Sequence, residues 1–225
     1  MEIGEITLLF PSCLYYNALG DDMYRIKEDV IAELEIKKSR FITYLHRNEK
    51  EEDAKQFIQF VKKEHPNATH HCYAFLIGEQ NEIRRSNDDG EPAGTAGVPM
   101  LECLDHNHLQ DITAVTVRYF GGIKLGAGGL IRAYSKSVSN ALNHAILVEK
   151  KKMLQFSLRF DYALIGRMDH YFREEGITIV EKNYDTDVHI VYLCAKDNTE
   201  AICSLTNGSY LPTLEKEVLC EVDHQ

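Results

Sequence analysis

A glycine-rich segment is the part of the chain whose residue types point most directly to chemistry. Residues 121–130, GGIKLGAGGL, stand at the start of a predicted helix and contain Gly121, Gly122, Gly126, Gly128 and Gly129. Glycines let backbone N–H groups converge, and the first turn of a helix adds about half a positive charge. Such a turn is suited to holding a phosphate or a carboxylate group.

Basic side chains accompany these glycines, and acidic side chains are missing around them. Arg118, Lys124, Arg132 and Lys136 flank the turn, and residues 112–148 contain no Asp or Glu, although the chain has 35 acidic residues. This pattern predicts an anion-binding or nucleic-acid-binding surface. A purely structural role is equally compatible with it, because buried strands and half-buried helices also exclude acids. The glycine spacing fits neither G-x-x-x-x-G-K-[ST] nor G-x-G-x-x-G, so an ATPase or a dehydrogenase is disfavoured and no cofactor is predicted.

An acidic loop is the second candidate site. The segment SNDDGEPAGTAG, residues 86–97, carries Asp88, Asp89 and Glu91, with Thr95 near the cap of the next predicted helix. The carboxylates could act as acid and base or bind a metal, but Asp-Gly and Glu-Pro are also ordinary in turns. An enzyme acting on a small anionic substrate would use the glycine turn as a cradle and Asp89 or Glu91 as base.

Histidines and cysteines give weaker signals. His70 and Cys72 share one face of a predicted strand, and His106 and His108 lie at a predicted helix end, where a histidine favours the helix dipole. No spacing supplies the further ligands that a zinc site needs. We therefore predict no metal site and assign no catalytic residue.

The composition limits the classes of partner. The net charge of −10 argues against a protein coated in nucleic acid, although a local basic patch remains compatible with it. The chain has 6 cysteines but no C-x-x-C pair, which indicates reduced thiols and a cytoplasmic location. The apolar start, ITLLFPSCLYYNALG, follows no Lys or Arg and is interrupted by Pro11, so neither a secretory signal nor a membrane partner is predicted.

The elements that would position these residues follow from periodicity. The pattern predicts strands on both sides of a turn at residues 37–39, a helix closed by Pro66, a strand in 69–78, a helix starting near Gly97, a central strand in 112–120 and a helix reaching Ile146. After residue 149 the order βαββαβ predicts a ferredoxin-like unit. We expect an α+β protein of two domains, 23–149 and 150–225, with 1–22 as an uncertain N-terminal extension.

Two motifs resemble those of a known family. DGEPAGTAGVPML and VRYFGGIKLGAGGLIRAY are similar to signatures of the IMPACT family, in its bacterial two-domain YigZ branch, and KKSRFI resembles the opening strand of that family. The resemblance implies an N-terminal domain similar to domain 2 of ribosomal protein S5 and a C-terminal domain similar to those of elongation factor G. Eukaryotic members compete for an activator of a kinase that senses amino-acid starvation.

The residues and the resemblance together predict a cytoplasmic, non-enzymatic binding protein. We expect it to associate with translation, with RNA or with the ribosome through the basic glycine-rich turn. A protein-interaction regulator of translational control is the first alternative, and an enzyme acting on a small anionic substrate is the second. The sequence favours no particular oligomeric state.

Overall fold

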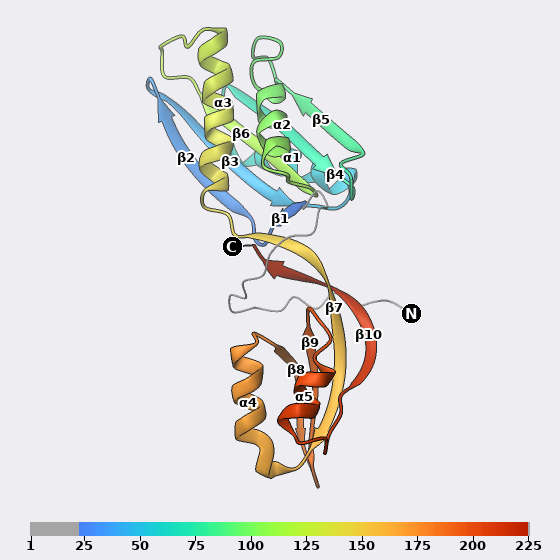
Figure 1. Ribbon diagram of the computed structural model, residues 1–225. Helices are drawn as coiled ribbons and strands as arrows, with labels where there is room; N and C mark the ends of the chain where they lie inside the picture. The colour runs from blue at the N-terminus through green and yellow to red at the C-terminus, as the bar shows by residue number, and fades with distance from the viewer. Residues whose placement is uncertain (1–22, 225) are drawn as a thin grey trace. The chain divides into compact units, whose positions relative to one another are not determined.

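The chain forms two compact units of mixed α and β structure. The computed structural model describes residues 23–224, and the predicted extension, residues 1–22, lies outside the described residues. Residues 23–149 with His224 form the first unit, and residues 150–223 form the second (Figure 1). The chain therefore has the two-domain α+β fold expected from the sequence. No helix within residues 23–224 is long and apolar enough to cross a membrane.

A five-stranded antiparallel sheet forms the centre of the first unit. Its strands lie in the order β2-β3-β6-β4-β5. They are β2 (Val30–Ile36), β3 (Ser39–Arg47), β4 (His70–Ile77), β5 (Ile83–Asn87) and β6 (Ile112–Tyr119). Strand β6 is central and is buried along almost its whole length, as its β-branched sequence predicts. A short strand, β1 (Tyr24–Ile26), pairs with Leu147–Glu149 at the start of β7 (Leu147–Phe160).

Helices cover both faces of this sheet. Helix α1 (Glu51–Glu64) packs Ala54, Ile58 and Val61 against one face. Helices α2 (Gly97–His106) and α3 (Ala127–Leu142) lie side by side on the other (Figure 1). Successive residues of β4 and β6 therefore enter two different hydrophobic clusters, because side chains alternate across a strand.

Two predicted boundaries need correction. The turn between β2 and β3 consists of Lys37 and Lys38 alone, with φ of 47° and 64°, and Ser39 already belongs to β3. Helix α3 ends at Leu142, with Asn143 as its cap, so Ile146 lies outside the helix and is exposed. Ile146 fits the four-residue spacing of apolar side chains in α3, but it lies in the connection between α3 and β7, which begins at Leu147.

The second unit has the element order that the sequence predicts. After β7 come α4 (Ile165–Glu174), β8 (Thr178–Tyr184), β9 (Val188–Cys194), α5 (Thr199–Leu205) and β10 (Thr213–Asp223), with a short 3-10 turn at Tyr162–Leu164. Strand β7 pairs with both β9 and β10, and β9 pairs with β8. The side chains of Phe156, Met168, Phe172 and Tyr192 fill its core between sheet and helices.

Candidate nucleic-acid interface

Three loops meet at one end of the first unit. Arg40 in β3 pairs with Tyr119 in β6, and His70 in β4 pairs with Arg118 in β6. The β2–β3 turn, the acidic loop at 88–96 and the glycine-rich loop at 120–126 therefore gather at the same end of the sheet, where α2 and α3 also begin (Figure 1). We call this region the glycine-turn end and define it as residues 37–38, 88–96 and 120–129.

Different structural constraints apply at the glycines of the turn. Gly121 leaves no space for a side chain, because a Cβ atom there would overlap the carbonyl group of Lys38. Its N–H donates to Ser39 Oγ at 3.2 Å, so it serves packing and is not free for a ligand. Gly122 and Gly126 have φ of 84° and 70°, a region that favours glycine. Gly128 faces open space in the first turn of α3, with Gly129 next to it.

The N-terminus of α2 already holds an anion of the chain itself. Asp88 Oδ1 accepts from the N–H groups of Ala96 and Gly97 at 3.0 and 2.8 Å, and Asp88 Oδ2 accepts from Gly94 at 2.8 Å. Burial would raise the pKa of Asp88, but these backbone N–H groups outweigh burial and hold the pKa below its ordinary value. The helix cap predicted near Thr95 is therefore supplied by Asp88, while the Thr95 hydroxyl donates to the Pro92 carbonyl.

The N-terminus of α3 has no such partner. Its cap residue is Gly126, its first turn contains no acidic residue, and its first hydrogen bond runs from Leu130 N–H to the Gly126 carbonyl at 2.9 Å. The N–H groups of Ala127, Gly128 and Gly129 have no hydrogen-bond partner within residues 23–224. The positive end of the α3 dipole is thus directed to solvent.

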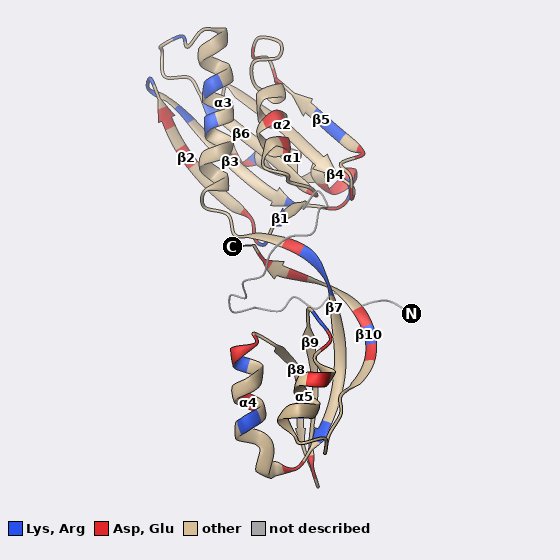
Figure 2. Ribbon diagram, viewed as in Figure 1, with Lys and Arg blue, Asp and Glu red and all other residues tan. Residues whose placement is uncertain are grey.

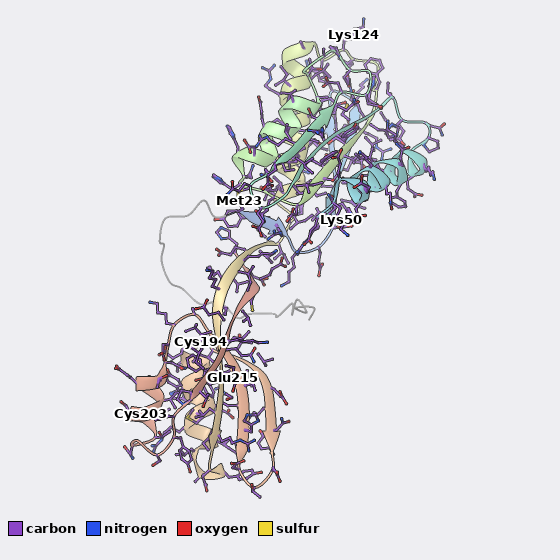
Figure 3. All side chains as sticks on the ribbon, turned by 90° about the vertical axis from the view of Figure 1, so that its right-hand side faces the viewer. Met23, Lys50, Lys124, Cys194, Cys203 and Glu215 are labelled. Carbon is purple, nitrogen blue, oxygen red and sulfur yellow. The ribbon has the colours of Figure 1, made fainter. Side chains whose placement is uncertain are left out.

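Exposed basic residues lie in the loop before this N-terminus and along α3. Lys124 lies at the glycine-turn end of the first unit (Figure 3), and Arg132 and Lys136 are exposed along α3, which carries no acidic residue (Figure 2). The structure adds Lys37 and Lys38, which are both exposed, and the backbone of Lys38 contacts Gly121. The sequence pattern predicts only a turn at these two lysines, although a lysine pair at a position where Asn-Gly is usual also indicates a basic loop.

Arg118 does not belong to the predicted anion-binding set. Its side chain is only 6% exposed, and Nη1 lies 2.5 Å from Glu91 Oε1. Tyr134 also donates to this Glu91 oxygen, at 2.8 Å. The charges of Arg118 and Glu91 therefore neutralise one another, which also removes Glu91 as a free base.

Asp89 is also paired within the chain. Lys62 Nζ donates to Asp89 Oδ1 at 2.8 Å, and the His71 N–H donates to Oδ2 at 2.7 Å. Burial would raise the pKa of Asp89, but Lys62 and the His71 N–H lower it below its ordinary value, which is opposite to what a general base at neutral pH requires. Asp89 lines a cavity of about 300 Å³ together with residues of α1, β4 and β5, and no residue of the glycine turn contributes to that cavity.

Cys72 is a buried, protonated thiol. It is fully buried, and its single S–H can donate either to the Asp88 carbonyl, which lies 3.0 Å from Sγ, or to Tyr134 Oη, which lies 3.3 Å from Sγ. Burial raises its pKa to about 12, so a thiolate nucleophile is not available near neutral pH. All the described cysteines are free, and residues 23–224 contain no cluster of three or more His, Cys, Asp or Glu side chains that could hold a metal.

Comparison with known proteins identifies the family. Residues 37–142 match the Impact N-terminal domain, and residues 158–208 match a domain of unknown function, DUF1949. The IMPACT family member YvyE of Bacillus subtilis is 48% identical over 189 residues, which cover 82% of this chain and 87% of YvyE. The chain belongs to the IMPACT family.

Further relatives agree with this assignment. The IMPACT family member YigZ of Escherichia coli is 45% identical over 144 residues, 60% of this chain and 71% of YigZ. A crystal structure described as that of a hypothetical protein matches with a TM-score of 0.55 at 33% identity, over 88% of this chain and 99% of its own. The family predicted from the sequence motifs is therefore confirmed, and both motifs lie within the Impact N-terminal domain.

Proposed function

We propose that this IMPACT family member is a non-enzymatic, cytoplasmic RNA-binding protein that acts in translation. Its basic surface contacts phosphate groups of RNA or of the ribosome. This surface consists of Lys37, Lys38, Lys124, Arg132 and Lys136 around the glycine turn. The observation that carries the proposal is the contrast between two helices that begin at the same end. Asp88 occupies the N-terminus of α2, whereas the first N–H groups of α3 have no partner among the residues that the structure describes.

Charge supports a phosphate at this place. Residues 112–148 contain no acid within a chain of net charge −10, so the positive field is local to this surface. Backbone N–H groups at a helix N-terminus favour an anion, and nearby lysines and arginines add to the attraction. RNA and the ribosome are the proposed ligands because membership of the IMPACT family implies domains similar to those of ribosomal protein S5 and elongation factor G.

An enzyme acting on a small anionic substrate has less support. Asp89 is paired with Lys62 and Glu91 with Arg118, so both proposed bases already have cationic partners. The cavity beside Asp89 does not include the glycine turn that would have served as the cradle.

The proposal is tested by binding across a salt series. We would measure fluorescence anisotropy of labelled single-stranded and duplex RNA, and sedimentation with ribosomes, for the natural chain and for Lys124→Ala with Arg132→Ala. Each phosphate contact on a single strand contributes about −0.7 to the slope of log affinity against log salt. The double variant should therefore bind more weakly, with a slope less steep by about 1.4.

A matched control removes two charges elsewhere. Lys50 lies beyond the far end of β3 from the Lys37–Lys38 turn, and Lys216 lies in the second unit; both are exposed. Lys50→Ala with Lys216→Ala should leave the slope unchanged. Equal losses in both double variants would mean that only net charge matters, and an absence of binding at low salt would favour a protein regulator as partner.

A further inference from the structure

Phe120 is an aromatic ring exposed within the basic surface. It is a large apolar side chain that follows β6 directly and is 47% exposed. The guanidinium carbon of Arg118 lies over the ring, 5.6 Å from its centroid, and Arg118 itself is only 5% exposed. The ring is therefore supported from the protein side by a buried cation, while its remaining surface faces solvent.

The backbone around Phe120 is held from both sides. The Phe120 N–H donates to Thr69 Oγ1 at 3.1 Å, and the N–H of Gly121 donates to Ser39 Oγ at 3.2 Å. Gly121 is also packed against the backbone of Lys38. Because the backbone on both sides of Phe120 is already held, this segment loses little conformational entropy when a ligand covers it.

The neighbours of the ring carry positive charge. The backbone of Lys38 packs against Gly121, the residue that follows Phe120, and Lys124 lies in the same loop as Phe120. Aromatic rings set among cations are the usual combination in sites for single-stranded nucleic acids, where bases stack on the rings and cations follow the phosphates. In a duplex the faces of the bases are already stacked on one another and are not accessible to the ring.

We propose that Phe120 is a stacking platform for an unpaired base of single-stranded RNA, placed beside the phosphate contacts of the basic surface. The inference rests on the proposed function and narrows its ligand from RNA in general to unpaired nucleotides. Single strands, or unpaired loops of a larger RNA, should bind more tightly than a duplex of the same charge per strand.

The chain offers a direct reporter because it contains 0 tryptophans. Phe120→Trp places a single indole in the platform, and Phe60→Trp places one on α1, at a position that is 53% exposed and lies outside the basic surface. Titration with a single-stranded RNA should quench the emission of the indole at position 120 and leave that at position 60 unchanged. An otherwise identical strand whose central nucleotides lack bases keeps every phosphate and should quench neither.

The affinity for the single-stranded RNA is the second readout, and it is measured with the natural chain, which has no tryptophan. Phe120→Leu should weaken binding of the base-bearing strand at least about fivefold, since stacking contributes that much or more per base. It should leave binding of the abasic strand unchanged, and circular dichroism should show an unchanged fold. If the strand binds but position 120 is not quenched and Phe120→Leu has no effect, the platform is refuted while the basic surface stands. If neither strand binds at low salt, the proposed function itself fails.

Discussion

Removal of the Glu91 carboxylate should destabilise the first unit strongly. The side chains of Glu91 and Arg118 are 4% and 6% exposed, and their charged atoms lie 2.5 Å apart. Glu91→Ala would leave the guanidinium buried without its counter-charge, which costs about 3–5 kcal/mol. Part of this cost comes from Tyr134, whose hydroxyl loses its acceptor in the cluster.

Urea denaturation measures this cost. We would follow the first unit by the fluorescence of Phe60→Trp, used as a common background for all variants. With a slope of about 1–3 kcal/mol per molar urea, the loss corresponds to a fall of roughly 2 M in the midpoint. Glu91→Gln keeps an oxygen acceptor but not the charge, so its urea midpoint should lie between that of Glu91→Ala and that of the unsubstituted background.

An exposed ion pair supplies the control. Arg84 and Asp105 form a salt bridge of 2.8 Å, with side chains 44% and 42% exposed. Asp105→Ala should therefore cost no more than about 1 kcal/mol. If Glu91→Ala shifted the midpoint no further than Asp105→Ala, then Arg118 would have to reach solvent or another partner, and its description as a buried, neutralised cation would be wrong.

Three further predictions concern the same end of the molecule. Folding lowers the pKa of Asp88, so the stabilisation by its carboxylate is complete above the ordinary pKa near 3.8 and is lost as pH falls through the folded pKa. In Asp88→Asn, the free energy of unfolding, measured by urea titration, should therefore fall less between pH 5 and pH 2 than it does in the natural chain. Brief alkylation at pH 8 followed by peptide mass spectrometry should label the half-buried Cys203 and leave the fully buried Cys72 unmodified until the chain is unfolded, and early labelling of Cys72 would contradict its burial. Lys37 and Lys38 both have positive φ, a backbone conformation that Asn and Gly adopt at lower cost. Lys37→Asn with Lys38→Gly should therefore raise the free energy of unfolding by about 1 kcal/mol and weaken RNA binding. An unchanged free energy of unfolding would mean that the turn is unstrained.

Much of the fold could be predicted from local pattern. The alternation in VIAELEI and the stripe of Ala54, Ile58 and Val61 depend on residues within about four positions of one another, which is the range over which periodicity acts. The prediction of the end of α3 was wrong: the spacing of apolar residues extended the helix to Ile146, whereas the helix ends at Leu142. The cap of α2 was also missed, since Asp88 reaches the helix from eight positions before Ala96.

The sequence by itself determined the two α+β units, the family, and a glycine turn in an acid-free stretch next to basic residues. Only the tertiary structure decided which charged side chains remain available to a ligand. Arg118 and Glu91 are 27 positions apart, and they meet because β6 lies between β3 and β4 and brings its end beside the acidic loop. The same sheet order places the Lys37–Lys38 turn against Gly121. Pairing of charges depends on which strands become neighbours, and in this sheet β6 lies between strands that are distant from it in the chain. Such non-local pairing is a property of the whole unit, which no short segment of sequence contains.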